Sequence, residues 1–154
     1  MARRIAFGFL ILLVITGCAS SKKSRTRQVD RVIKTARSFR GTPYKWGGTT
    51  RAGMDCSGLL INSFASIDYP IPRMSADQSK IGKKVKLKDI RRGDLVFFAT
   101  GNKRRKITHV GLVTDVRGKE KVMFIHSSSS RGVIETNMYS TYYKKRFIMA
   151  RRVL

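Results

Sequence analysis

The stretch from Gly41 to Phe64 reads GTPYKWGGTTRAGMDCSGLLINSF, and its two halves have different compositions. The first half is rich in Gly, Thr and Pro, which is typical of a loop. Asp55 then supplies a residue type favoured at helix N-caps, and Leu60 and Phe64 follow at helical spacing. We therefore expect a loop that ends at Asp55 and a helix with one apolar face.

Cys56 falls in the first turn of this expected helix, four residues before Leu60 on the same face. An unperturbed thiol has a pKa of about 8.5 and is only slightly ionised at neutral pH. The positive end of a helix dipole favours the thiolate, and a nearby imidazolium favours it further. A cysteine on an inward helix face can also be a small core residue, so a nucleophilic role requires a partner base.

The two histidines of the chain are the available bases. His109 opens the run HVGLVTDV and His126 closes the run KVMFIH, and the turn-like residues RGKE lie between these alternating segments. A β-hairpin centred on Gly118 and Lys119 places His126 opposite Gly111, diagonal to His109 at roughly 7 to 8 Å on the same face. Each histidine alone could be a hydrogen-bonded residue at a strand end, but together with a thiol they have the pattern of nucleophile, base and orienting residue.

The periodicity of the remaining chain predicts a single α+β domain. A helix is expected at about 28 to 40, and the nucleophile helix is expected to pack on an antiparallel sheet of about five strands. The expected strands are 94 to 99, 109 to 116, 121 to 126, 132 to 136 and 146 to 152.

The first 17 residues, MARRIAFGFLILLVITG, have the order of a secretory signal: two arginines, an apolar run and then small residues. The apolar run is too short to span a bilayer of roughly 30 Å as a stable helix. Ile15 to Cys18 resembles the lipobox of bacterial lipoproteins, which predicts lipidation of Cys18 as the first mature residue. A secretory peptide with a chance cysteine and a short core helix are the alternatives.

Ala19 and Ser20 follow this cysteine, in place of the aspartate that retains enterobacterial lipoproteins at the inner membrane. We therefore expect an outer-membrane anchor facing the periplasm. Residues 18 to 28 are expected to form the lipidated cysteine and a polar tether, and 29 to 154 the folded domain.

The chain has 154 residues, with 33 Lys and Arg against 9 Asp and Glu, a net charge of +24. A field of one sign indicates nucleic acid, an anionic membrane or an acidic polymer as partner. Removal of the signal leaves 31 basic and 9 acidic residues, or +22. Export argues against nucleic acid. The two cysteines and two histidines exclude a disulfide-rich scaffold and a multi-Cys or multi-His zinc site.

Four short motifs occur in the order of a known family. They are Gly41 to Gly48 (GTPYKWGG), Asp55 to Gly58 (DCSG), Arg92 to Val96 (RGDLV) and His109 to Leu112 (HVGL). In these motifs the sequence resembles the NlpC-type cell-wall cysteine peptidases, papain-like enzymes that cut the stem peptides of peptidoglycan. The resemblance covers about Val29 to Leu154, and its C-terminal stretch is similar to that of the small lipoprotein murein endopeptidases.

The resemblance implies that Cys56 is the nucleophile, His109 the general base and His126 the residue that orients His109. The interval between the histidines is a few residues longer than the family leads us to expect, which the tip of the hairpin can absorb. This family chemistry needs no metal and no cofactor.

Three further residues receive roles from the same resemblance. Tyr44 matches a tyrosine that lies beside the nucleophile and is associated with the oxyanion site and with substrate binding. Asp55 and Ser57 flank the cleft, where contact with the stem peptide is expected.

The resemblance implies a monomeric thiol endopeptidase that cleaves the D-alanyl to diaminopimelate cross-link in cell-wall remodelling. Other family members cut between D-glutamate and the diamino acid, which is the first alternative. A non-catalytic wall-binding lipoprotein and an acyltransferase on the same scaffold are further alternatives. The expected partners are stem peptides and, through Cys18, a membrane.

Overall fold

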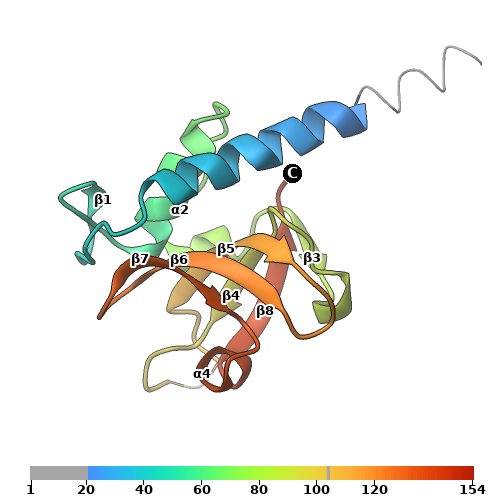
Figure 1. Cartoon of the computed structure of the whole chain (residues 1–154). Helices are drawn as coiled ribbons and strands as arrows, with labels where there is room; N and C mark the ends of the chain where they lie inside the picture. The colour runs from blue at the N-terminus through green and yellow to red at the C-terminus, as the bar shows by residue number, and fades with distance from the viewer. Residues whose placement is uncertain (1–20, 104) are drawn as a thin grey trace, which may run out of the picture.

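The computed structural model describes residues 21–103 and 105–154 as one α+β domain (Figure 1). The signal sequence and Cys18 therefore lie outside the described residues. Residues 21–38 are helical, and this N-terminal helix and α2 (Cys56–Ala65) cover the same face of an antiparallel sheet. Among the described residues, no helix combines the length and the apolar character that a membrane crossing requires.

Six strands form the sheet, in the spatial order β3-β8-β4-β5-β6-β7 with every neighbouring pair antiparallel. The five expected strands are confirmed. The sixth, β3, was missed because it is short and lysine-rich. The strands are β3 (Lys83–Val85), β4 (Leu95–Phe98), β5 (His109–Val116), β6 (Val122–Ser128), β7 (Gly132–Asn137) and β8 (Phe147–Arg152).

The connections between these strands contain short elements. A hairpin of two strands, each two residues long, precedes α2. Short helical turns lie between α2 and β4 and between β7 and β8. These elements are β1 (Thr49–Thr50), β2 (Gly53–Met54), α3 (Ser75–Gln78), the 3-10 turn η1 (Leu87–Asp89) and α4 (Thr141–Lys144).

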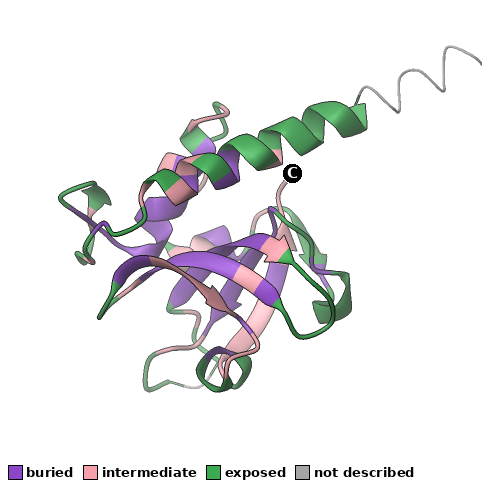
Figure 2. Ribbon diagram, viewed as in Figure 1, coloured by how far each residue is buried: buried purple, intermediate pink, exposed green. Residues whose placement is uncertain are grey.

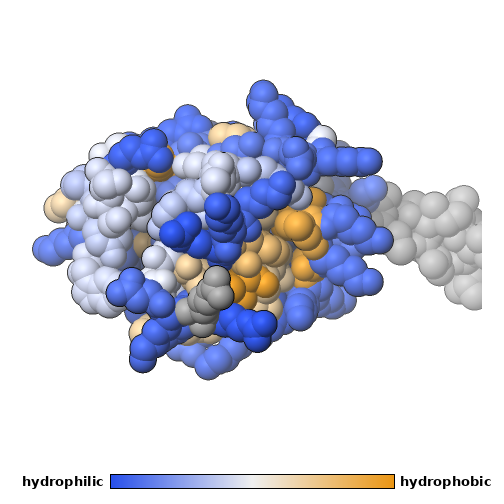
Figure 3. All heavy atoms as spheres, turned by 90° about the horizontal axis from the view of Figure 1, so that it is seen from below, coloured by the Kyte–Doolittle hydropathy of each residue, from blue (hydrophilic) through white to orange (hydrophobic). Residues whose placement is uncertain are grey.

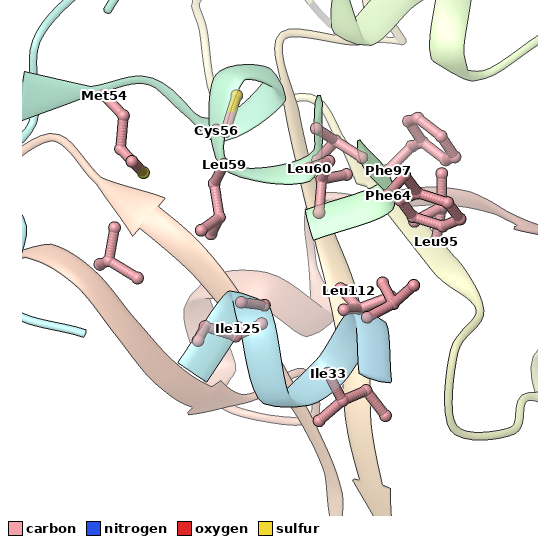
Figure 4. Packing of buried hydrophobic residues seen from close by; sticks show 14 residues of the cluster. Ile33, Met54, Cys56, Leu59, Leu60, Phe64, Leu95, Phe97, Leu112 and Ile125 are labelled. Carbon is pink, nitrogen blue, oxygen red and sulfur yellow. The ribbon is translucent and has the colours of Figure 1, made fainter. Parts of the chain in front are cut away.

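Both faces of the sheet are buried under packed side chains. Because side chains alternate along a strand, each strand contributes to both faces. On β4, Leu95 and Phe97 join the cluster under the helices, whereas Val96 and Phe98 join a second cluster on the opposite face. Figure 4 shows the side chains of α2 packed toward those of the sheet. Among the described residues, both clusters and the apolar residues packed on them come from position 29 onward.

The surface around this interior is largely hydrophilic. The first turns of the N-terminal helix are exposed, whereas the middle of the sheet is buried (Figure 2). Seen from below, hydrophilic side chains surround a hydrophobic area (Figure 3).

The N-terminal helix corrects one boundary. It is helical from residue 21, seven residues before the expected start, so residues 21–28 of the predicted tether are helical and almost fully exposed. Lys, Arg and Gln have good helix propensity, and a helix nucleated by the apolar face after residue 28 extends readily through them. The sequence did not predict this extension, because residues 21–28 are polar and exposed and so show no apolar periodicity.

The register between β5 and β6 agrees with the expected hairpin. Leu112 pairs with Ile125 and Val113 with Phe124, which is the predicted alignment. A bulge after Val113 then shifts the pairing by one residue near the tip. The extra length of the hairpin is therefore absorbed between the bulge and the tip, away from the histidines.

Candidate active site

The start of α2 is fixed by its N-cap. Asp55 has extended backbone geometry, and its Oδ1 accepts a hydrogen bond of 2.7 Å from the Gly58 N–H. A side chain at Gly58 would meet the Gly48 carbonyl oxygen at 2.4 Å, so glycine allows the helix to approach the preceding loop. Cys56 is the first helical residue and is buried within the cluster under the helices.

Arg73 locks the same N-cap from outside the helix. Its guanidinium donates to both oxygens of Asp55 at 3.0 and 2.6 Å and to Ser57 Oγ at 2.8 Å. Burial raises the pKa of Asp55, but the bonds from Arg73, the Gly58 N–H and Ser57 outweigh this and hold it below its usual range. Asp55 is therefore an ionised N-cap residue, and both of its carboxylate oxygens already accept hydrogen bonds.

A chain of hydrogen bonds joins the two histidines. His109 Nε2 lies 2.9 Å from His126 Nδ1, and His126 Nε2 lies 3.1 Å from Thr136 Oγ1 and 3.4 Å from the Tyr143 hydroxyl. If His126 donates from Nε2, it accepts at Nδ1 from His109 Nε2–H. His109 Nδ1, which no hydrogen bond within the described residues uses, is then the free basic nitrogen.

Aromatic side chains enclose this pair. The ring of Phe124 stacks on His126 at 4.6 Å, and Tyr143 lies 5.1 Å from His126 and 6.2 Å from His109. A side chain at Gly111 would meet Phe124 at 2.4 Å, so glycine is required for Phe124 to lie across β5. The packing holds both imidazoles in one arrangement.

The thiol and the histidine share one groove with a volume of about 1270 Å³. Cys56 and His109 line it, each less than a tenth exposed, and the Val110 N–H next to His109 favours the thiolate of Cys56. The geometry therefore brings the nucleophile candidate to the start of β5. Other lining residues include Tyr44, Trp46, Arg73, Ile107, Arg131 and Tyr142.

Burial controls the ionisation of these groups. It raises the pKa of Cys56 to about 11, although the N–H groups of Val110, Ser57 and Cys56 act in the opposite direction. It also lowers the pKa of His109 to about 4 and that of His126 to about 3. The helix start favours the thiolate as expected, but burial outweighs this effect. Thiol and imidazole are therefore both neutral.

The other expected residues lie at the groove in different states. Tyr44 is half-buried, and its backbone forms an isolated β-bridge with Met54. Burial, together with the nearby Cys56 and Asp55, raises the pKa of its phenol. Asp55 and Ser57 line the groove, but they are buried and bonded to Arg73. Within the described residues, no group of three or more His, Cys, Asp or Glu side chains could hold a metal ion.

Sequence reasoning missed three residues of this arrangement. Arg73, Thr136 and Tyr143 contact the site from elements distant in the chain, and none belongs to a short motif. Thr136 faces His126 because β7 pairs with β6, where His126 aligns with Ile134. A register prediction extended to β7 could have found it. No comparable local signal indicates Arg73.

Comparisons with known proteins agree with this geometry. The NlpC/P60 family matches residues 41–152. The probable endopeptidase NlpC of Escherichia coli is 33% identical over 97% of this chain and 99% of its own length. The murein DD-endopeptidase MepS/murein LD-carboxypeptidase of E. coli is 38% identical over 83% of this chain and 66% of its own. The gamma-D-glutamyl-L-lysine dipeptidyl-peptidase of Bacillus subtilis is 40% identical over 80% and 40%, respectively.

Solved structures lead to the same conclusion. An NlpC/P60 family protein from Bacillus cereus superposes with a TM-score of 0.72 and 34% identity. The match covers 82% of this chain but only 40% of that structure, so this chain spans about two fifths of the larger protein. The family match covers most of the chain and includes the loop, the start of α2 and the strands that carry the two histidines. The chain belongs to the NlpC/P60 family.

Proposed function

We propose that this chain is a thiol endopeptidase of peptidoglycan stem peptides, with Cys56 as nucleophile, His109 as general base and His126 as the residue that orients it. The observation that carries the proposal is the hydrogen-bonded pair of histidines, of which His109 lines the groove that also contains the start of α2. The names of the relatives, which include a murein endopeptidase, support the substrate class.

The first step is attack on a peptide carbonyl. As the Cys56 sulfur forms its bond to the carbonyl carbon, His109 Nδ1 takes the thiol proton and the carbonyl π electrons move to oxygen. Because both groups start neutral, this proton transfer accompanies the attack instead of preceding it. His126, held by Thr136, keeps the His109 tautomer with its lone pair on Nδ1.

The tetrahedral oxyanion then needs donors. We assign the Cys56 N–H at the start of α2 and the Tyr44 hydroxyl, which lies near Cys56 and lines the same groove. When the oxyanion collapses, the carbon–nitrogen bond breaks and His109 returns its proton to the leaving amine. His109 next deprotonates a water molecule, which attacks the thioester and releases the thiol and the new carboxylate.

The groove is suited to an acidic peptide. Arg131 and Lys106 line it, and within the described residues neither forms an ion pair. Stem peptides carry carboxylates on D-glutamate and diaminopimelate, which these cations attract. The preferred bond is the D-alanyl to diaminopimelate cross-link. The alternative is the bond between D-glutamate and the diamino acid, which the name of the B. subtilis relative favours.

We further propose that Cys18 carries the lipid anchor and that the domain is held at the outer membrane facing the periplasm, as a monomer. The support is the order of residues 1–18, which has the pattern of a lipoprotein signal. Labelling cells with a radioactive fatty acid tests this, since Cys18→Ala should abolish incorporation.

Mass spectrometry of defined muropeptides after digestion tests the activity. The proposal expects a cross-linked dimer to give two monomers, each product pair gaining one water. Products cut after D-glutamate would instead support the alternative bond. Unchanged substrates under conditions in which the protein is folded would contradict the peptidase function.

A further inference from the structure

A second groove, far from the thiol, lies between the N-terminal helix and the turn that precedes β4. It has a volume of about 810 Å³ and shares no lining residue with the catalytic groove. We call it the N-terminal groove. Its lining includes Lys22, Arg25, Val29, Ile90, Arg91 and Leu154.

The rim of the N-terminal groove carries free positive charge. Arg92 is paired with Asp30 and Arg152 with Asp94, both at 2.8 Å. Lys22, Arg25 and Arg91, by contrast, are exposed and form no ion pair within the described part of the chain. These three cations are therefore available to an anionic partner.

The edge of the sheet extends this charge. β3 is an edge strand, and its Lys83 pairs with Arg152, which lines the N-terminal groove. Three more exposed lysines follow Lys83 along the chain. The exposed lysines of this segment are Lys83, Lys84, Lys86 and Lys88. Together, the groove rim and this edge form one basic surface.

Exposed apolar side chains lie within the basic surface. Leu87, between two lysines, is 44% exposed, and Val116 at the groove is 38% exposed. Val29 and Leu154 are partly buried in the groove lining. Cations mixed with accessible apolar groups are typical of surfaces that rest on lipid headgroups and reach the acyl boundary.

The position of the surface in the chain indicates the same partner. Ser21, the first described residue, lines the N-terminal groove and is three residues from Cys18. The 18-residue helix from 21 to 38 spans about 27 Å and leads into the loop with Tyr44 and Trp46 at the catalytic groove. In Figure 1 the C-terminus lies beside the N-terminal half of the helix, whereas β1 lies near the other end of the helix.

We propose that the N-terminal groove and the β3 edge bind the surface of an anionic phospholipid membrane. This contact would hold the catalytic groove away from the lipid and toward the wall. The inference rests on the proposed envelope location of the chain, but it requires neither catalysis nor the lipid anchor. An anionic wall polymer is the competing partner, and the experiment separates the two.

The experiment uses a chain that begins at residue 19, because both core clusters lie within the part that remains. Its co-sedimentation is measured with vesicles of phosphatidylcholine alone and with vesicles containing about 30% phosphatidylglycerol. We expect binding only to the anionic vesicles, and loss of binding in high salt. The triple variant Lys22→Gln, Arg25→Gln, Arg91→Gln should bind about 100-fold more weakly, since each basic residue near such a surface contributes about fivefold.

The matched control removes three charges at the catalytic end: Lys45→Gln, Lys103→Gln and Lys145→Gln. This variant has the same net charge, so it should keep most of the vesicle binding. The second test variant, Lys84→Gln, Lys86→Gln, Lys88→Gln, weakens binding if the β3 edge takes part. Thermal unfolding checks that each variant is folded.

Equal losses in the groove triple and the control triple would overturn the proposal, because bulk charge would then explain the binding. It would also be overturned by binding to isolated sacculi that depends on the same three residues when vesicle binding does not. Cys56→Ala should bind vesicles like the parent. Failure of the peptidase proposal is therefore distinguishable from failure of this one.

Discussion

The two grooves differ in how they place their polar groups. At the catalytic groove, His109 lines the cavity and His126 lies behind it; both are buried, bonded to one another and surrounded by aromatic rings. In the N-terminal groove, Lys22, Arg25 and Arg91 are exposed. Burial shifts the pKa values of the histidines and packing fixes their tautomers, which serves proton transfer, whereas exposed charges serve attraction. The comparison separates a site for chemistry from a surface for binding.

The largest expected effect comes from removal of the thiol. Cys56→Ala should lower turnover of a soluble muropeptide at least about 1,000-fold, because loss of a covalent nucleophile removes the acyl-transfer route. The side chain is small and sits at the helix start, so thermal unfolding should change little. The groove triple variant is the matched control and should retain parental turnover. Comparable losses in both variants would remove the distinction between the grooves.

Acid should destabilise the protein through the buried histidines. Their folded pKa values of about 4 and about 3 lie below the ordinary 6.5, so the unfolded chain binds more protons between these values. Their contribution to stability is complete above pH 6.5 and is lost as pH falls toward 4 and 3. Each histidine should contribute at most about 1.4 kcal/mol per pH unit in that window.

Urea unfolding between pH 7 and pH 4.5 measures this slope. His126→Gln should reduce it, because only His109 then remains to be protonated on unfolding. A slope that is the same in the variant and the parent would show that folding does not lower the pKa of His126.

A smaller effect is expected from Thr136, a positioning residue that acts through His126. Thr136→Val removes the acceptor for His126 Nε2–H while keeping the shape of the side chain. Because the His109 tautomer is then less strongly held, we expect kcat to fall about tenfold with little change in KM. Thr136→Ser restores a hydroxyl and should recover most of the rate. A fall in Thr136→Ser as large as that in Thr136→Val would contradict the hydrogen-bond role.

The smallest effect is expected at the N-terminal groove. The ion pair between Arg92 and Asp30 is about half exposed on both sides, at 47% and 51%. Solvent screening limits such pairs, so Arg92→Gln should change the free energy of unfolding by no more than about 1 kcal/mol. Urea unfolding at neutral pH gives this number directly. A loss of several kcal/mol would show that this surface has a structural role comparable to that of the buried site.

The parts of the site that are local in sequence could be predicted. The turn between β5 and β6 sets the pairing of the two strands, and this pairing alone predicts that His126 lies beside His109. The N-cap at Asp55 followed from residue type and spacing alone. In each case a short-range rule determines the geometry, so composition and periodicity suffice.

The parts that depend on tertiary contacts could not. Arg73 reaches Asp55 across 18 residues of loop and short helix, and Tyr143 reaches His126 from α4. β3 carries two exposed lysines and one buried valine, so only its backbone pairing with β8 makes it a strand. The neutral state of the thiol was also not predictable, because the depth of burial at a helix start is not encoded in nearby residues.

The account depends most on the covalent role of Cys56. Intact-protein mass spectrometry after rapid acid quench, followed by peptide mapping, measures this role directly in the chain from residue 19. During turnover of a defined muropeptide, we predict an added mass equal to the acyl part of the substrate, attached to Cys56 and absent from Cys56→Ala. Turnover without any adduct on Cys56, or continued turnover by folded Cys56→Ala, would contradict the account.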